Sequence, residues 1–141
     1  MNIEKKLEII KSTKNEYIVF VKIGAFYRVY GKDASIISYL SGYEINKNEI
    51  GFPLTSLTKV TERLIQESIN YVEASNGEDG LKIDREQTFY ENNYLPVYNK
   101  AKRYIMLKNR IDEISNYLMN NINSENIRQK LNDIEDILYY E

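Results

Sequence analysis

The chain has 141 residues, of which 43% are hydrophobic and 28% charged, with a formal net charge of −2. This length suits one domain, or one small domain with an appendage, in a globular protein. The chain contains no Cys and no His, which excludes disulfides, the commonest zinc ligands and the usual Ser-His and Cys-His nucleophile pairs. The net charge argues against binding nucleic acid by bulk electrostatics alone, although residues 1–32 hold seven Lys/Arg and only three Glu.

The N-terminal residues 1–14 predict a short amphipathic helix with Ile3, Leu7 and Ile10 on one stripe. Charges lie within its apolar part, so we do not expect a signal peptide. No apolar run approaches the roughly 20 residues of a membrane span. Together with the absence of Cys, these features predict a cytoplasmic protein.

Two strands and a helix are predicted next. Residues 17–23 are β-branched and aromatic, and residues 26–30 alternate in the manner of a strand. Gly24 lies between the two strands. Gly31 precedes a helix, and Gly42 is a natural end for it.

The middle of the chain continues with alternating elements. Residues 43–45 predict a short strand, and the Gly-Phe-Pro sequence at 51–53 predicts a turn. A helix over 56–67 and a strand over 69–74 follow, with a glycine-bounded acidic turn at 76–80. Two weaker strand candidates come after this turn, at 81–83 and 87–90.

From Pro96 onward the pattern becomes helical. One apolar stripe runs over about six turns, and a polar break at 120–124 precedes a second stripe. Residues 96–140 therefore predict a helical hairpin. Altogether we expect an α/β (α+β) fold with a mixed sheet flanked by helices, a domain over 1–92 and a hairpin over 93–141 that packs or docks. The two stripes comprise Val97, Ala101, Tyr104, Leu107, Ile111, Ile114 and Leu118, and then Ile127, Leu131, Ile134 and Leu138.

The stretch FVKIGAFYRVY at residues 20–30 resembles the opening signature of domain I of MutS mismatch-repair proteins, roughly F-x-R-M-G-D-F-Y-E-L-F. An acidic residue and Ala follow in that family, as at 33–34 here. A G-x-P turn, a helix and a strand come later, as at 51–53, 56–67 and 71–74. The order and spacing agree over roughly residues 5–90.

The resemblance implies a DNA-contacting surface at residues 26–28. In the family, the Phe of this motif enters the minor groove and stacks on a mispaired base, and the Glu two residues later hydrogen-bonds that base. By position, Phe26 is the wedge, Arg28 replaces the Glu, and Lys22 replaces a basic residue of the preceding strand, with Tyr27 inside the motif. Arg only donates hydrogen bonds, so Arg28 puts mismatch selectivity in doubt but leaves contact with phosphate or a narrow minor groove open.

Each of these residues also has an interpretation that involves no DNA. Without the resemblance, a Phe at position 26 is more often a core residue of a strand, and Arg28 is as readily a plain surface residue. The run of basic residues at 100–110 suits phosphate contact, but a solvated helix face is the commoner case. Adjacent acidic pairs elsewhere have no partner residue that would make them catalytic.

The resemblance also has limits that define the expected function. No G-x-x-x-x-G-K-[ST] loop occurs, so we expect a stand-alone, non-enzymatic module without the MutS ATPase and without a cofactor or metal. We expect weak binding to DNA or RNA–DNA duplex, with a protein partner or a second copy held by the C-terminal helices. Short proteins of this kind also resemble accessory proteins of diversity-generating retroelements, which implies a reverse transcriptase complex. The alternative is a protein-interaction adaptor that keeps the fold without binding DNA.

Overall fold

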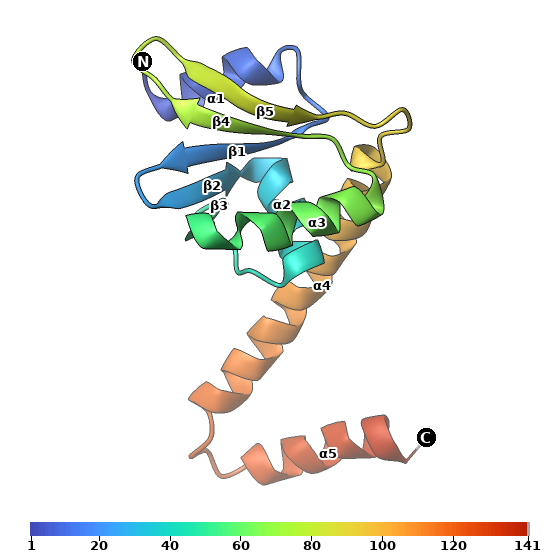
Figure 1. Ribbon diagram of the computed structural model, residues 1–141. Helices are drawn as coiled ribbons and strands as arrows, with labels where there is room; N and C mark the ends of the chain where they lie inside the picture. The colour runs from blue at the N-terminus through green and yellow to red at the C-terminus, as the bar shows by residue number, and fades with distance from the viewer. Residues whose placement is uncertain (141) are drawn as a thin grey trace. The chain divides into compact units, whose positions relative to one another are not determined.

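A five-stranded mixed sheet forms the centre of the fold in the computed structural model, which describes residues 1–140 (Figure 1). The strand order is β3-β2-β1-β4-β5. The central strands β1 and β4 are parallel, and every other neighbouring pair is antiparallel. The strands are β1 (Ile18–Ile23), β2 (Phe26–Tyr30), β3 (Glu49–Pro53), β4 (Tyr71–Asn76) and β5 (Leu81–Gln87).

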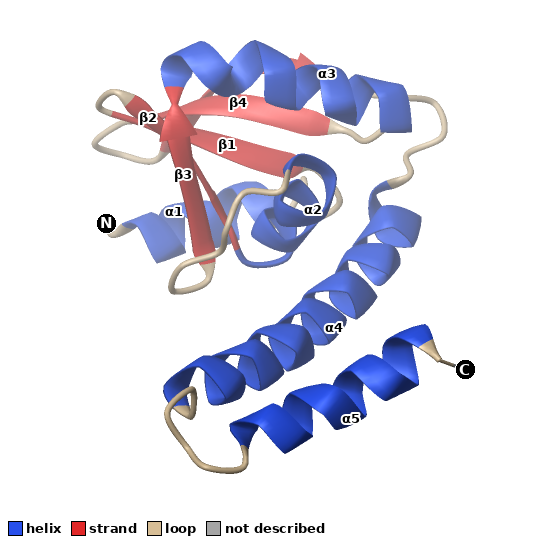
Figure 2. Cartoon of the chain, turned by 90° about the horizontal axis from the view of Figure 1, so that it is seen from below, coloured by secondary structure: helices blue, strands red, loops and turns tan. Residues whose placement is uncertain are grey.

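Helices cover both faces of this sheet (Figure 2). Helix α1 packs on one face, while α2, α3 and the first turns of α4 pack on the other. This arrangement confirms the predicted α+β fold with a mixed sheet flanked by helices. The helices are α1 (Ile3–Lys11), α2 (Gly31–Ser41), α3 (Leu57–Glu67), α4 (Tyr94–Asn120) and α5 (Ile127–Tyr139), with a 3₁₀ turn at Leu54–Ser56 before α3.

The chain divides into two compact units, Met1–Ile105 and the residues from Met106 onward. The first unit holds the sheet, and the second holds the rest of α4 and α5. Within the second unit, the ammonium group of Lys130 lies 4.6 Å from the centre of the Tyr117 ring. No side chain of α5 is buried. No helix among residues 1–140 is long and apolar enough to cross a membrane.

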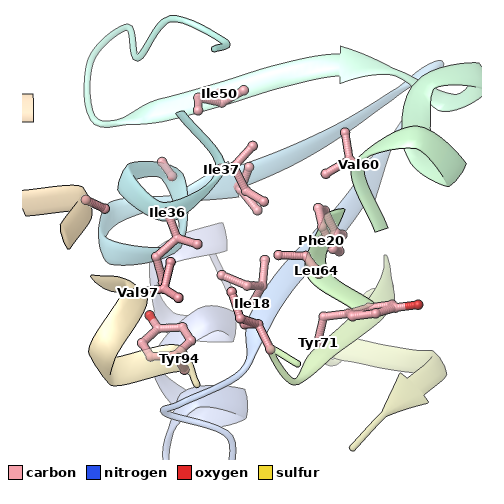
Figure 3. Packing of buried hydrophobic residues seen from close by; sticks show 14 of the residues in the cluster. Ile18, Phe20, Ile36, Ile37, Ile50, Val60, Leu64, Tyr71, Tyr94 and Val97 are labelled. Carbon is pink, nitrogen blue, oxygen red and sulfur yellow. The ribbon is translucent and has the colours of Figure 1, made fainter. Parts of the chain in front are cut away.

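Strand alternation gives β1 a buried side chain on each face. Ile18 and Phe20 point into the cluster shared with α2, α3 and α4, which Figure 3 shows. Val19 and Val21 point into the second cluster, under α1. The Phe20 ring lies edge-on to Phe52, with the centroids 5.9 Å apart. A strand buried on both faces can only be central, and this is the place that β1 occupies.

A buried carboxylate joins four elements of the first unit. Asp33 of α2 is 2% exposed and accepts hydrogen bonds from the Val19 amide at 2.9 Å and the Tyr94 hydroxyl at 2.6 Å. The Lys11 ammonium lies 2.7 Å from the same carboxylate. Burial raises the pKa of Asp33, and Lys11, Tyr94 and Val19 oppose that rise. The group thereby links β1, α1 and α4 to the start of α2.

Strand β3 was not predicted. Residues 51–53 form the end of this strand instead of a turn, because Ile50 and Phe52 alternate into the core at 2% and 1% exposure. Pro53 is tolerated because it ends the strand. Residues 43–45 form no strand, and a turn with positive φ at Lys47 and Asn48 precedes β3. The second weak strand candidate, 87–90, contributes only Gln87, the last residue of β5.

The predicted helices are present, and two of their predicted boundary signals are confirmed. Helix α2 ends before Gly42, which has φ 77 as expected of a C-terminal glycine. Helix α4 begins at Tyr94, two residues before Pro96, so the proline lies in its first turn as predicted. The compact unit also extends to Ile105 and includes these first turns, whereas the sequence pattern placed the division at 92/93.

We predict that Tyr94→Phe lowers the free energy of unfolding by about 1.5–3 kcal/mol, because it removes a hydrogen bond to a buried charged group. Urea denaturation measures this difference. Tyr98→Phe is the matched control, since Tyr98 stacks on Tyr94 but makes no described hydrogen bond through its hydroxyl. An equal loss in both variants would contradict a specific role for the Tyr94–Asp33 bond.

We also predict that the free energy of unfolding depends on pH through Asp33. Because burial raises its pKa above the usual 3.8, the folded chain holds this proton more tightly than the unfolded chain. The contribution of Asp33 to stability therefore falls as the pH rises from 3.8 through the folded pKa. Comparing urea denaturation of the wild type and Asp33→Asn across the acidic range should show the wild type losing stability relative to the variant. A relative gain with rising pH would mean that Lys11 lowers this pKa.

Candidate nucleic-acid interface

A tight hairpin presents the predicted wedge residue. Strands β1 and β2 are joined by Gly24 and Ala25, and Gly24 adopts φ 60, a left-handed conformation that glycine tolerates. The register places Phe26 opposite Ile23, at the first position of β2. Phe26 is 45% exposed, so its interpretation as a core residue is wrong. The sheet fixes the backbone of this residue while its ring remains accessible.

Strand alternation separates the four candidate residues onto two faces of the sheet. Arg28 lies opposite Val21, a residue of the α1 cluster, so Phe26 and Arg28 share that face. Tyr27 points the other way, and its ring packs 6.4 Å from that of Phe20. Lys22 is exposed and lies opposite Tyr27, on the same face as that ring. The structure therefore brings Phe26 and Arg28 together and places Lys22 and Tyr27 on the opposite face.

Tyr27 packs against the main core. Its ring contacts Phe20 and Phe52 and belongs to the edge of the main core. Burial raises the pKa of the Tyr27 hydroxyl, and the nearby Glu73 and Asp84 raise it further. The half-buried ring packs the β1–β2 hairpin against the main core. It does not add to the exposed surface around Phe26.

Arg28 is paired with a carboxylate that sequence reasoning missed. Its Nη1 lies 3.2 Å from Oε1 of Glu49 on β3, and both side chains are more than a third exposed. Arg28 faces Gly51 across the β2–β3 ladder, and a Cβ at Gly51 would lie 3.5 Å from Nη1. Glycine thus leaves the guanidinium lying over bare backbone. Alternation along β3 puts Glu49 and Gly51 on one face, but this strand was not predicted from the sequence.

A polar pocket of about 510 Å³ opens beside this pair. A two-residue turn forms one side of it, closed by hydrogen bonds in both directions between the backbones of Asn46 and Glu49. Lys47 and Asn48 occupy the centre of the turn with φ 53 and 65, as a type I′ turn requires. The lining residues are Phe26, Arg28, Glu44, Asn46, Lys47, Glu49 and Gly51.

The pocket does not have a strongly basic charge. Its two cationic residues, Arg28 and Lys47, are matched by Glu44 and Glu49. Most of the basic residues in 1–32 are also engaged within the protein, which leaves fewer of them for contact with phosphate. Lys6 donates to Asn76 and Gly77, Lys11 pairs with Asp33, and Lys14 pairs with Glu86.

The basic run at 100–110 lies on exposed positions of α4, except for the half-buried Lys108. The Lys102 ammonium lies 5.3 Å from the centre of the Tyr98 ring, and Lys108 pairs with Asp112 at 3.0 Å. Such contacts fit a solvated helix face, which was the commoner of the two interpretations.

The arrangement around Phe26 is suited to recognition. It offers an aromatic ring, a hydrogen-bond donor and an acceptor within one open pocket. Among residues 1–140, no group of three or more His, Cys, Asp or Glu side chains is arranged to hold a metal ion. The side chains that line this site can stack on a ligand and form hydrogen bonds with it.

The comparison with known proteins identifies a family for the part of the chain that contains this hairpin. A family model described as MutS domain I matches residues 2–105, the part that contains the sheet and the first turns of α4. Among curated proteins, none matches the chain significantly. Domain I is the non-catalytic, DNA-contacting recognition domain of MutS proteins. The matched region covers most of the sequence and ends at the boundary of the first compact unit, so the chain belongs to the MutS domain I family.

Proposed function

We propose that the protein is a non-enzymatic accessory module that binds distorted or mispaired duplex through Phe26 and Arg28. The observation that carries this proposal is the Phe26 ring, 45% exposed at the end of a tight hairpin, in a chain of the MutS domain I family. An aromatic residue in a sheet normally gains more from burial than from exposure. A ring held outward by the backbone is therefore available to a ligand.

The energetics favour a weakened base step over a regular one. Stacking on an inserted aromatic ring contributes about 1–3 kcal/mol per base. Unstacking and kinking a regular duplex costs a few kcal/mol, so insertion of Phe26 is close to neutral there. A mispair or bulge has already lost part of its stacking, and this lowers the cost. Entry through the minor groove is the geometry that such wedge residues use.

Arg28 changes the balance between affinity and discrimination. A guanidinium is a donor that adds to duplex affinity through phosphate or groove contacts. It cannot accept a hydrogen bond from a mispaired base, as the family's Glu does. We therefore propose preference for distorted duplex with less selectivity among mispairs than the Glu would give.

Phe26→Ala tests this function. We predict a roughly 5- to 100-fold loss of affinity for a bulged or mismatched duplex, measured by fluorescence anisotropy at low salt, because the stacking energy is lost. Ile65→Ala is the matched control, since Ile65 of α3 is 46% exposed but lies outside the pocket. Matched, mismatched and RNA–DNA duplexes form the panel. Absence of binding, or binding that does not depend on Phe26, would refute the proposal.

An adaptor that does not bind DNA is the second candidate. The charge-balanced pocket and the engaged lysines favour it, because phosphate contacts need unpaired cations. Exposed apolar side chains of the second unit also favour a protein partner. Eleven large apolar residues of 106–140 are at least 40% exposed, which is unusual for a surface that faces only water.

We propose that this apolar surface pairs with a second copy of the chain. From Leu107 through Ile111 and Ile114 to Leu118, the α4 stripe repeats at spacings of four, three and four, the pattern of a coiled-coil seam, and a symmetric dimer would bring identical seams together. Dimerisation would join two Phe26 sites and raise avidity for duplex.

The double variant Ile111→Glu/Ile114→Glu tests the dimer. Both side chains are exposed, at 65% and 59%, so the charges should abolish association without unfolding the chain. Size-exclusion chromatography with light scattering should show a dimer for the wild type and a monomer for the variant. Ile65→Glu on α3 should remain dimeric. A wild type that is monomeric at every concentration would refute the dimer and favour a different protein as the partner.

We further propose that the larger complex contains a reverse transcriptase of a diversity-generating retroelement. Error-prone reverse transcription yields mispaired RNA–DNA duplex, and a wedge residue suits that product. Support for this rests on the likeness to accessory proteins of such elements. Co-purification with a reverse transcriptase encoded beside the gene is the experiment, and a neighbourhood without such an enzyme would contradict the proposal.

A further inference from the structure

The Arg28–Glu49 pair places a donor and an acceptor side by side next to the Phe26 ring. Arg28 has five N–H donors and uses one on Glu49 at 3.2 Å. The Glu49 carboxylate has about four acceptor sites, and in the described part of the chain its one side-chain bond is with Arg28. Both groups are 35–39% exposed and line the same pocket as the ring. Each therefore keeps hydrogen-bonding capacity for a ligand.

The minor groove offers one base edge that matches such a pair. Adenine, thymine and cytosine present only acceptors there, whereas guanine presents the N3 acceptor beside the N2 amino donor. A cation alone binds any of these edges. A carboxylate is repelled by acceptors and gains a hydrogen bond only from the guanine amino group. An adjacent donor and acceptor therefore select guanine.

We infer that Glu49 and Arg28 recognise the minor-groove edge of a guanine next to the step that Phe26 enters. Glu49 accepts from the N2 amino group, and Arg28 donates to N3 while holding the carboxylate in place. This inference rests on the proposed function, because it needs Phe26 in the minor groove. It assigns to β3 the acceptor that position 28 of this chain lacks.

The local structure holds both groups in position. Arg28 is fixed by the β2–β3 ladder and by the bare backbone of Gly51. Glu49 begins β3 directly after the turn, and its backbone is bonded to Asn46 in both directions. The turn holds Lys47 and Asn48 at positive φ, the backbone conformation of a type I′ turn. This turn fixes the point at which β3 begins, and with it the position of the Glu49 backbone.

An ordinary surface ion pair is the competing explanation. Exposed pairs of this kind contribute little to stability, at most about 1 kcal/mol, so stability gives no strong reason for the pair. Its place beside an exposed ring and a 510 Å³ pocket is what an ordinary surface pair does not explain.

Base analogues test the inference directly. Hypoxanthine is guanine without the N2 amino group, and 2,6-diaminopurine is adenine with one added. Fluorescence anisotropy with a bulged duplex carrying each base beside the bulge should show about tenfold tighter binding for guanine than for hypoxanthine, the value of one charged hydrogen bond. 2,6-Diaminopurine should bind more tightly than adenine. Equal affinities within each pair would overturn the inference.

Two variants show which carboxylate produces the preference for guanine. Each of them removes one negative charge. Glu49→Ala should bring the guanine-to-hypoxanthine ratio to about one. Glu44→Ala, on the same pocket, should keep the ratio, because the carboxylate paired with Arg28 is that of Glu49. A ratio lost in Glu44→Ala and kept in Glu49→Ala would overturn the assignment. Failure of the proposed function is distinguishable, since binding would then be absent or independent of Phe26 with every duplex.

Discussion

The buried carboxylate of Asp33 is the interaction on which the first unit depends. An isolated charge in a protein interior is strongly unfavourable, so its partners must be present together. Those partners come from β1, α1 and α4, at Val19, Lys11 and Tyr94. The start of α4 is thereby made part of the sheet domain, and Val97 and Ala101 of the same helix also pack into its core.

Strand alternation then determines which side chains the candidate interface contains. β1 is buried on both faces, and β2 beside it carries Tyr27 toward the core and Phe26 and Arg28 toward the opposite face. Helix α1 packs with β1, β4 and β5 on that face, and none of its residues lines the pocket on β2 and β3. The pocket lies on this part of the sheet, between the hairpin and the turn before β3. Its position therefore follows from the order of the strands.

The charge distribution sets the kind of binding that this surface supports. Ion pairs within the protein engage Lys11, Lys14 and Arg28, and the pocket balances its cations with carboxylates. Little energy is then available from phosphate contacts, which dominate non-specific binding. In the proposed binding mode, stacking by Phe26 and hydrogen bonds to base edges are the larger contributions, and they act at individual steps of a duplex. A module of this kind benefits from a second copy or a partner, for which the exposed face of residues 106–140 is suited.

The sequence by itself determined the elements with strong local signals. The β1–β2 hairpin, the end of α2 at Gly42, the turn after β4 and the C-terminal helices follow from residue spacing and glycine positions, and the motif at 20–30 indicated the family. Only the tertiary structure decided which side chains meet. Gly51-Phe52-Pro53 resembled a turn because glycine and proline usually end strands, yet pairing with β2 and burial of Phe52 made it an edge strand. That pairing brought Glu49 to Arg28 across 21 positions of sequence, a contact that no local pattern contains.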